Sequence, residues 1–226
     1  MGTSRVQLHV AAIDKLAAAA MAGGLGWLTE VEAGRLQAMR AQARRDSFLA
    51  GHWQARKLVA RWLGVRSARI SLASFADGRP LVCLDDDPVP LSLSLSHSGD
   101  WLAVALGEVA VGVDVELPRR LRDIDALAGF MFSRSDQQRL QAADAGERER
   151  VFLELWALNE ARVKRTGEGL HPRASRELGV RPCDTAGAQV LTWRFRSGAL
   201  ALALTPGAQV GCSGTRLDEA CGWRYL

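Results

Sequence analysis

The sequence has few of the features that mark membrane proteins, metal-cluster proteins or repetitive proteins. Among its 226 residues are only 4 cysteines, and no two of them have C-x-x-C spacing or stand beside a histidine tract. That absence argues against the common zinc-binding patterns. No stretch approaches the ~18 consecutive apolar residues of a membrane-crossing helix. Low-complexity linkers and short internal repeats are also missing, so we expect neither a disordered chain nor a repeat array.

The composition is that of an ordinary folded domain with a modest positive charge. Hydrophobic residues make up 48% and charged residues 24%, and the formal net charge is +4. Such a balance admits phosphorylated small molecules, acidic proteins and nucleic acids as partners. We expect no nucleic-acid partner, because the charge is modest and neither a helix-turn-helix nor an aromatic-basic RNA motif is present.

The cysteines and the N-terminal stretch predict the cellular location. The apolar stretch that ends at Trp27 is interrupted by Asp14 and Lys15. It lacks the basic region and clean apolar run of a signal peptide. Widely spaced cysteines are typical of reduced, mostly buried thiols. We therefore expect a cytoplasmic protein that does not bind a membrane.

Hydrophobic periodicity changes between helix and strand twice along the chain. Helical spacing is found in 48–63 and again from 123 to a long helix that ends near Gly167. The alternating pattern predicts strands at 6–10, 70–74, 81–84, 91–96, 101–106, 109–116, 190–196 and 199–205. Two rounds of helices and strands predict an α+β protein with an N-terminal half, 1–116, and a C-terminal half, 117–226.

Two acidic residues stand two apart in the segment Gly112-Val113-Asp114-Val115-Glu116. Residues two apart on a strand face the same way, so the carboxylates of Asp114 and Glu116 would lie side by side. Like charges this close repel unless a cation lies between them, and carboxylate oxygens suit a hard ion such as Mg²⁺. The same pattern would also describe two ordinary acids at a solvent-facing strand end.

The long helix predicted after residue 123 places Trp156, Glu160 and Lys164 four residues apart, on one ridge. Glu160 could complete a metal site, and Lys164 could meet a phosphate as a point charge. An exposed ion pair between them, worth ~0.3–0.5 kcal/mol, is the structural alternative. The glycines within 166–170 favour a ligand site, because a flexible loop lets a ligand approach the backbone.

A third segment, Leu95-Ser96-His97-Ser98-Gly99-Asp100, combines hydroxyl groups, an imidazole and loop amides. Neighbours on a strand point to opposite faces, so Ser96 and His97 cannot act as nucleophile and base without a sharp bend. A G-x-S-x-G elbow is also absent. The segment therefore suits a phosphate or nucleotide contact, although a structural histidine at a strand end would give the same pattern.

Taken in order, these segments and Gly78-Arg79-Pro80 resemble the signature of the Sfp-type 4′-phosphopantetheinyl transferases. The resemblance spans about residues 28–170, and the stretch 48–58 is similar to the family's first helix. Such enzymes move the 4′-phosphopantetheine arm of coenzyme A to a serine of an apo acyl- or peptidyl-carrier protein, releasing adenosine 3′,5′-bisphosphate. The resemblance implies a monomer of two similar α/β lobes, related by a pseudo-twofold axis, with the active site at their interface.

The resemblance also implies a role for each matching residue. Asp114, Glu116 and Glu160 would hold Mg²⁺ against the diphosphate of coenzyme A. Glu160 would accept the proton of the carrier serine and Lys164 would neutralise phosphate charge, so the predicted catalytic residues are Glu160, Lys164 and Asp114. The residues predicted to contact coenzyme A are Arg35, Arg45, Arg79, Ser96, His97, Asn159 and Lys164. A basic surface for an acidic carrier, or simply a solvated face, would comprise Arg119, Arg120, Arg122 and Arg134.

Two positions depart from the family pattern and keep other functions open. Asn159 stands where the family usually has a lysine, and His52 stands where its first helix has an arginine. Both changes imply coenzyme A binding that is weaker or more pH-dependent. They are also consistent with a non-catalytic homologue that binds coenzyme A or the carrier. A metal-dependent phosphate-ester hydrolase is a further alternative, since paired carboxylates also suit attack by water.

Overall fold

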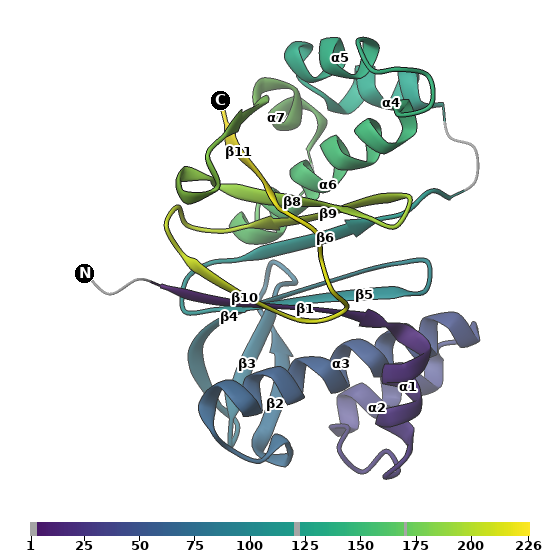
Figure 1. Ribbon diagram of the computed structural model, residues 1–226. Helices are drawn as coiled ribbons and strands as arrows, with labels where there is room; N and C mark the ends of the chain where they lie inside the picture. Colours follow the sequence, from purple (N-terminus) through teal and green to yellow (C-terminus); the bar gives the residue numbers. More distant parts are fainter. Residues whose placement is uncertain (1–3, 120–122, 170) are drawn as a thin grey trace.

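The structure is a computed structural model that describes residues 4–119, 123–169 and 171–226. Two β-sheets face one another across the middle of the molecule, and each carries helices on its outer face (Figure 1). The apolar cluster between the sheets includes Val6, Leu8 and Val10 from one sheet and Val113 and Leu200 from the other. The layers from one end to the other are therefore helices, sheet, sheet and helices.

The first sheet contains six strands in the order β10-β1-β5-β4-β3-β2. Its strands are β1 (Arg5–Ala12), β2 (Ile70–Ser74), β3 (Pro80–Leu84), β4 (Asp87–Ser98), β5 (Trp101–Gly107) and β10 (Gln209–Gly214). The helices of this half are α1 (Ile13–Met21), α2 (Glu30–Ala38), α3 (Gln42–Leu63) and the 3₁₀ helix η1 (Ser67–Arg69). Thr29 caps α2 in a capping box with Glu32. Gly64 ends α3 in the left-handed conformation.

The second sheet contains five strands in the order β6-β9-β8-β11-β7. Its strands are β6 (Gly112–Glu116), β7 (Val180–Cys183), β8 (Val190–Phe195), β9 (Gly198–Ala203) and β11 (Cys221–Tyr225). The helices of this half are α4 (Ile124–Met131), α5 (Arg134–Gln141), α6 (Arg148–Thr166), α7 (Pro172–Glu177) and the 3₁₀ helix η2 (Thr185–Gly187).

Five strands of each sheet form an antiparallel run, and the two runs differ in how their strands are connected. The run β1-β5-β4-β3-β2 and the run β6-β9-β8-β11-β7 are both antiparallel throughout. In the first sheet, strands β2 to β5 lie in chain order and β1 pairs with β5, whereas in the second sheet β11 lies between β8 and β7. The predicted α+β class is confirmed, and the two halves resemble one another in having a five-stranded antiparallel run with helices on its outer face (Figure 1).

The strand pairing crosses the predicted division between 1–116 and 117–226 at two strands. β6, which closes the predicted N-terminal half, pairs with β9 in the second sheet. β10, from the C-terminal half, pairs in parallel with β1 at the edge of the first sheet. Residue pattern identifies a strand but carries no information on which sheet receives an edge strand. The division therefore stays a prediction for the chain's domains, while the sheets themselves exchange one strand in each direction.

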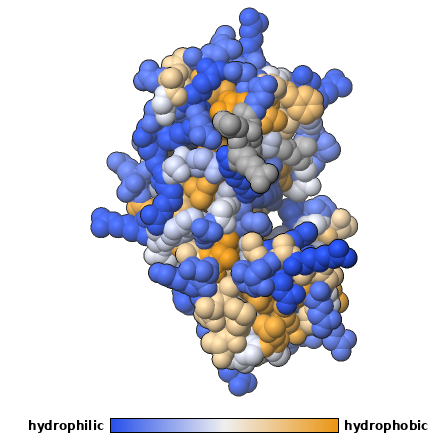
Figure 2. Space-filling model, turned by 90° about the vertical axis from the view of Figure 1, so that its right-hand side faces the viewer, coloured by the Kyte–Doolittle hydropathy of each residue, from blue (hydrophilic) through white to orange (hydrophobic). Residues whose placement is uncertain are grey.

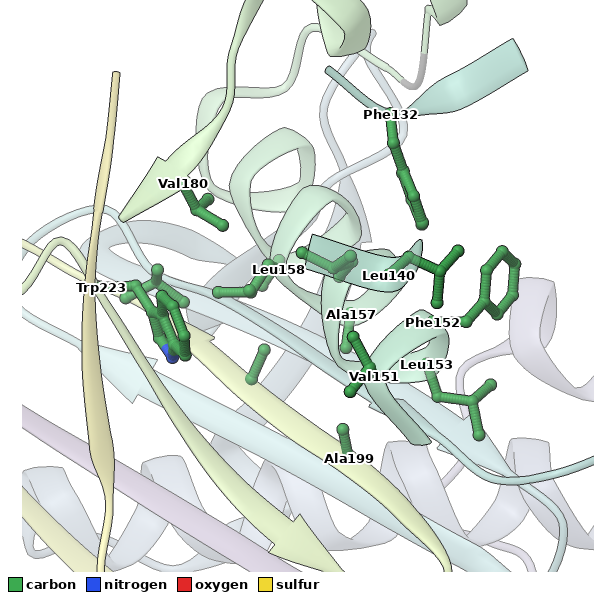
Figure 3. Packing of buried hydrophobic residues seen from close by; sticks show 14 of the residues in the cluster. Phe132, Leu140, Val151, Phe152, Leu153, Ala157, Leu158, Val180, Ala199 and Trp223 are labelled. Carbon is green, nitrogen blue, oxygen red and sulfur yellow. The ribbon is translucent and has the colours of Figure 1, made fainter. Parts of the chain in front are cut away.

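Helix α6 packs on the second sheet through its buried apolar residues. Figure 3 shows Phe152, Ala157 and Leu158 of α6 among the surrounding buried side chains. At the start of β6 the two backbones nearly touch, because a Cβ atom on Gly112 would lie 2.0 Å from the Ala161 carbonyl oxygen. Glycine at this position thus determines how closely α6 approaches β6.

We expect Gly112→Ala to destabilise the protein by about 1–3 kcal/mol, because the added methyl group forces α6 away from β6. Urea unfolding should show a lower midpoint with an unchanged slope. Gly34→Ala is the matched control, since nothing lies within 4 Å of a Cβ there. That variant should be neutral or more stable by about 0.5–1 kcal/mol, as expected for alanine inside a helix. Equal stability of G112A and wild type would contradict the close approach.

A buried ionic network joins α2 to α3. Glu32 is 2% exposed and accepts a hydrogen bond from Arg56 Nη2 at 2.6 Å, with His52 Nδ1 2.6 Å from its other oxygen. Burial by itself raises the pKa of Glu32. The bonds from His52, Arg56 and Thr29 outweigh burial and lower that pKa from 4.5 to about 2. The network therefore stabilises the fold only while Glu32 is ionised.

We expect the free energy of unfolding to fall as the pH decreases from about 4.5 to about 2, because the pKa of Glu32 is lower in the folded chain than in the unfolded one. The shift corresponds to about 3 kcal/mol, at about 1.4 kcal/mol per pKa unit. Glu32→Gln should lose about 3–5 kcal/mol at neutral pH, since Arg56 stays buried without its partner. The deficit should shrink toward pH 2. Glu30→Gln, exposed on the same helical turn, is the control; an E32Q profile parallel to wild type would refute this role.

Candidate active site

A row of serine side chains on β4 holds the first sheet against the second. Each hydroxyl oxygen accepts a hydrogen bond from a backbone N–H of residues 111–117, at distances of 3.1, 3.0, 3.3 and 3.0 Å along the row. The four pairs are Ser92 with Val111, Ser94 with Val113, Ser96 with Val115, and Ser98 with Leu117. This serine row fixes the register of β6 on β4 and brings Ser96 next to Asp114.

Asp114 is a buried carboxylate with its bonds concentrated on one oxygen. Its Oδ1 accepts from Ser96 Oγ at 2.7 Å and from Lys164 Nζ at 2.6 Å. The residue is 3% exposed, and Oδ2 is buried without a hydrogen-bond partner among the described residues. Burial raises the pKa of Asp114, and Lys164 followed by Ser96 and Arg119 opposes that rise. A buried oxygen with free lone pairs is a place for a cation or a proton.

Helix α6 supplies Lys164 and Glu160 to the same region. Both are partly buried and lie one turn apart on the ridge predicted from the sequence. Burial raises the pKa of Glu160, the negative charge of Asp114 raises it further, and Lys164 lowers it. Trp156, the third residue of the ridge, instead packs on Phe152 with ring centroids 5.8 Å apart. Glu160 and Lys164 therefore share an electrostatic environment with Asp114, while Trp156 supports the helix.

A cavity of about 390 Å³ lies between the β3–β4 region and α6. It is lined by Asp77, Gly78, Arg79, Pro80, Leu93, Ser94, Leu95, Glu160, Val163, Lys164, Gly167 and Gly169. Residues of both halves thus form its walls. In the space-filling view of one face, a gap opens between the two halves, and both hydrophilic and hydrophobic residues border it (Figure 2).

Arg79 borders the cavity and is held in place from both halves. Its Nε donates to Asp77 Oδ2 at 2.9 Å, and its Nη1 donates to the Arg165 carbonyl oxygen at 3.3 Å. Gly167, which ends α6, has φ +79°, and a Cβ atom there would lie 2.7 Å from Arg79 Nε. A glycine is required here for both its backbone conformation and its contact. Arg79 thus lines the same cavity as Lys164 and Glu160, and its contact with coenzyme A stays a prediction.

The three predicted metal ligands come from neighbouring segments but do not form a preformed metal cage. Among the described residues, no group of three or more histidine, cysteine, aspartate or glutamate side chains could hold an ion as they stand. Lys164 Nζ donates a hydrogen bond to Asp114, where a metal ion would otherwise balance the carboxylate charge. Magnesium nevertheless needs only one or two carboxylates when water and substrate phosphates complete its shell. The free Oδ2 of Asp114 and the nearby Glu160 fit such an ion, and the full set with Glu116 stays a prediction.

Ser96 and His97, predicted to contact coenzyme A, lie beside Asp114 in different ways. Ser96 is 7% exposed, and its hydroxyl group donates to Asp114. His97 is exposed, and its carbonyl oxygen accepts from Arg119 at 3.5 Å. Packing around the ring, then the charges of Arg119 and Lys164, lower the pKa of His97. Ser96 thus orients a carboxylate, while His97 is the one of the two that reaches the surface.

The other residues predicted to contact coenzyme A do not line the cavity. Arg45 donates to the Leu36 carbonyl oxygen at 2.7 Å, and Arg35 lies over the Phe48 ring at 5.5 Å. Asn159 is buried and donates to the Leu155 carbonyl oxygen at 2.9 Å. Their predicted contacts with coenzyme A remain predictions, since the side chain of Arg45 bonds the end of the neighbouring helix α2 and that of Asn159 bonds within α6.

Asn159 and His52, the two residues that depart from the family pattern, both bond other side chains or backbone groups of the protein. Asn159 bonds within α6 and His52 pairs with Glu32, so neither side chain borders the cavity. Of the basic surface predicted for a carrier, Arg119 donates to Ser98 Oγ at 3.2 Å and Arg134 is exposed on α5. Arg120 and Arg122 lie outside the described residues.

Sequence reasoning missed the serine row and the supporting role of Asp77. The row has a visible signal, because serine recurs at every second position from Ser92 to Ser98. Alternating serines also describe the solvent face of an ordinary strand, so the pattern alone does not reveal a second sheet behind it. The Asp-Gly pair at 77–78 indicates only a turn, although the carboxylate of Asp77 holds Arg79 at the cavity.

The fold and the site define a two-lobed α+β protein whose lobes meet at a cavity of mixed charge, suited to a phosphate group and a cation. Comparisons agree with this class. The family model described as the 4′-phosphopantetheinyl transferase superfamily matches residues 110–204. The transferase psf-1 of Bacillus pumilus is 31% identical over 140 residues, covering 58% of this chain and 57% of that protein.

Two further relatives extend the match. The 4′-phosphopantetheinyl transferase AcpT of Salmonella typhimurium is 34% identical over 149 residues, covering 63% of this chain and 72% of AcpT. Sfp of Bacillus subtilis is 28% identical over 122 residues, covering 54% of this chain and 52% of Sfp. The chain belongs to the 4′-phosphopantetheinyl transferase superfamily, and the predicted resemblance to its Sfp-type members is confirmed. It spans little more than half the length of psf-1 and Sfp. None of its described helices has the length and apolar character needed to cross a bilayer.

We expect Ser96→Ala to destabilise the protein more than Ser92→Ala, by about 1 kcal/mol. Both variants leave one N–H of the 111–117 segment without its acceptor, but only S96A also removes a donor to the buried carboxylate of Asp114. Urea unfolding of the two single variants measures the difference directly. Indistinguishable midpoints would mean that the Ser96–Asp114 bond contributes nothing to stability.

Proposed function

We propose that this chain is a Mg²⁺-dependent 4′-phosphopantetheinyl transferase that uses coenzyme A and an apo acyl- or peptidyl-carrier protein. The observation that carries the proposal is the convergence of Lys164 and Ser96 on the buried Asp114, with Glu160 and Lys164 on the wall of the cavity between the lobes. Membership of the superfamily supports the reaction class. The cavity has basic and acidic groups for a diphosphate and its counterion.

Glu160 and Lys164 would carry the proton and the charge of the reaction. The hydroxyl oxygen of the carrier serine attacks the phosphorus that bears the pantetheine arm, and the bond from that phosphorus to the bridging diphosphate oxygen breaks. Glu160 would take the serine proton, directly or through water, and its raised pKa makes its carboxylate a stronger base. Lys164 would donate to the phosphate oxygens as charge moves to the departing adenosine 3′,5′-bisphosphate.

Asp114, Glu116 and Glu160 would hold Mg²⁺, which when bound neutralises charge on the diphosphate. Asp114 contributes a buried oxygen with free lone pairs, and Ser96 orients its carboxylate. The proposed contacts with coenzyme A comprise Arg35, Arg45, Arg79, Ser96, His97, Asn159 and Lys164. Of these, Arg79 and Lys164 have the strongest support, because both border the cavity.

We further propose that the protein acts as a monomer in the cytoplasm, with neither nucleic acid nor membrane among its partners. All four cysteines are unpaired, which suits a reducing compartment. Both walls of the cavity come from one chain, so a second copy is not needed to complete it.

The test is to incubate the protein with coenzyme A, Mg²⁺ and a panel of apo carriers and then weigh each carrier. We expect the mass of one phosphopantetheine on at least one carrier, and no gain when EDTA replaces Mg²⁺. Glu160→Gln should lower kcat/KM at least about 100-fold, the usual contribution of a positioned general base. Asp114→Asn should lower it comparably, and Asp86→Asn, at an exposed turn, should leave it unchanged.

The same assay separates the transferase from its alternatives. Binding of coenzyme A by calorimetry with no mass gain on any carrier would replace the transferase with a non-catalytic homologue. Release of adenosine 3′,5′-bisphosphate in the absence of any carrier would indicate a phosphate-ester hydrolase. Circular dichroism checks that D114N and E160Q are folded. If one of them is unfolded, its loss of activity says nothing about the site, and the activity of the other, folded variant tests the proposed active site.

A further inference from the structure

Lys164 lies directly on the carboxylate that is proposed to bind the metal. Its Nζ is 2.6 Å from Asp114 Oδ1, the oxygen to which Ser96 Oγ also donates at 2.7 Å. Asp114 is 3% exposed, so bulk water does little to screen its charge. The ammonium group of Lys164 is therefore the cation that balances this buried carboxylate.

Lys164 also acts on the second carboxylate of the site. Its positive charge lowers the pKa of both Asp114 and Glu160, against the burial that raises each of them. The negative charge of Asp114 raises the pKa of Glu160, so the two carboxylates repel one another. One ammonium group thus offsets a repulsion that a divalent cation between the acids would also offset.

Arg79, which also lines the cavity, and the arginines at 119 and 165 have other hydrogen-bond partners. Arg79 is paired with Asp77 at 2.7 Å. Arg119 donates to Ser98, and Arg165 donates to the Ala110 carbonyl oxygen at 3.1 Å. Within the described residues, Lys164 is the cation that bonds Asp114. Removal of its charge would leave that carboxylate available to another cation.

We infer that Lys164 is an internal counterion that keeps a divalent metal off Asp114 until the diphosphate of coenzyme A enters the cavity. The inference rests on the proposed function. A doubly charged ion on Asp114 repels the ammonium group, which must then leave the carboxylate. Lys164 and Arg79 both border the cavity, so a diphosphate there gives the displaced ammonium group a new anionic partner. Metal and coenzyme A should therefore strengthen one another's binding, by reciprocal linkage.

Titration of Mn²⁺ into the metal-free protein, followed by electron paramagnetic resonance, tests this order. Without coenzyme A, Lys164→Met should bind Mn²⁺ about tenfold or more tightly than wild type, because the metal no longer breaks a charge-assisted bond. Lys164→Arg keeps the charge and should stay weak. Lys15→Met, the same change at an exposed position on α1, should match wild type. Asp114→Asn should abolish the tight binding when added to K164M, which assigns the site.

The second arm repeats each titration with saturating coenzyme A. Wild type should gain Mn²⁺ affinity, and K164M should gain much less. Binding of Mn²⁺ by K164M that is equal to or weaker than wild type, or an undiminished gain with coenzyme A, overturns the inference. If K164M does not fold, the wild-type titrations test the inference instead, because a wild-type Mn²⁺ affinity that does not rise with coenzyme A also overturns it.

The coenzyme-free titrations need neither a carrier nor turnover, so they separate this inference from the proposed function. If K164M binds Mn²⁺ more tightly but no carrier is modified, the proposed transferase function is wrong and the counterion role stands. If a carrier is modified but K164M binds Mn²⁺ as wild type does, the counterion role is wrong and the proposed function stands.

Discussion

The serine hydroxyl groups of β4 join the first sheet to the second, although the described strands of the two sheets share no backbone hydrogen-bond ladder at this point. The candidate active site lies at this junction. β6 is the edge strand of the second sheet, and the N–H groups on its outer side point toward β4. Buried N–H groups without acceptors would cost about 1–3 kcal/mol each. The serine row on β4 supplies the acceptors, and Ser96 in that row also bonds Asp114. The interface and the orientation of the buried carboxylate thus have a common origin.

Burial of Asp114 sets the requirements for everything around it. A carboxylate that is taken out of water needs a cation or several donors nearby. Lys164 meets this need only because α6 lies close to β6, and that closeness depends on the absence of a side chain at Gly112. The same helix ends at Gly167 against Arg79. Two glycines, far apart in the sequence, therefore control how the second half presents its charges to the first.

Most of the elements near the site can be predicted from the sequence because their signals are local. Helix α2 is indicated by Thr29 and Glu32, the end of α6 by Gly167, and β6 by its alternating valines.

The site residues Asp114, Glu160 and Lys164 follow from spacing on one strand and one helix. Their convergence does not follow from spacing, since Lys164 and Asp114 are 50 residues apart. The partners of His52 and Asn159 are also hidden, because a helical position does not reveal which neighbour its side chain bonds. Strands β7, β10 and β11 and helix α7 are short or weakly patterned, and their pairing is decided by distant segments.

The chain passes from the second sheet to the first through β10 and then returns through β11. β10 lies beside β1, where Ser213 Oγ is 3.0 Å from His9 Nδ1 across 204 positions of sequence. Strand β1 thus gains this neighbour only after the residues that separate it from β10 have been synthesised. Contacts of such separation slow folding and couple distant segments into one cooperative transition. Fragments divided at residue 116 would therefore separate β1 from β10 and β6 from β9.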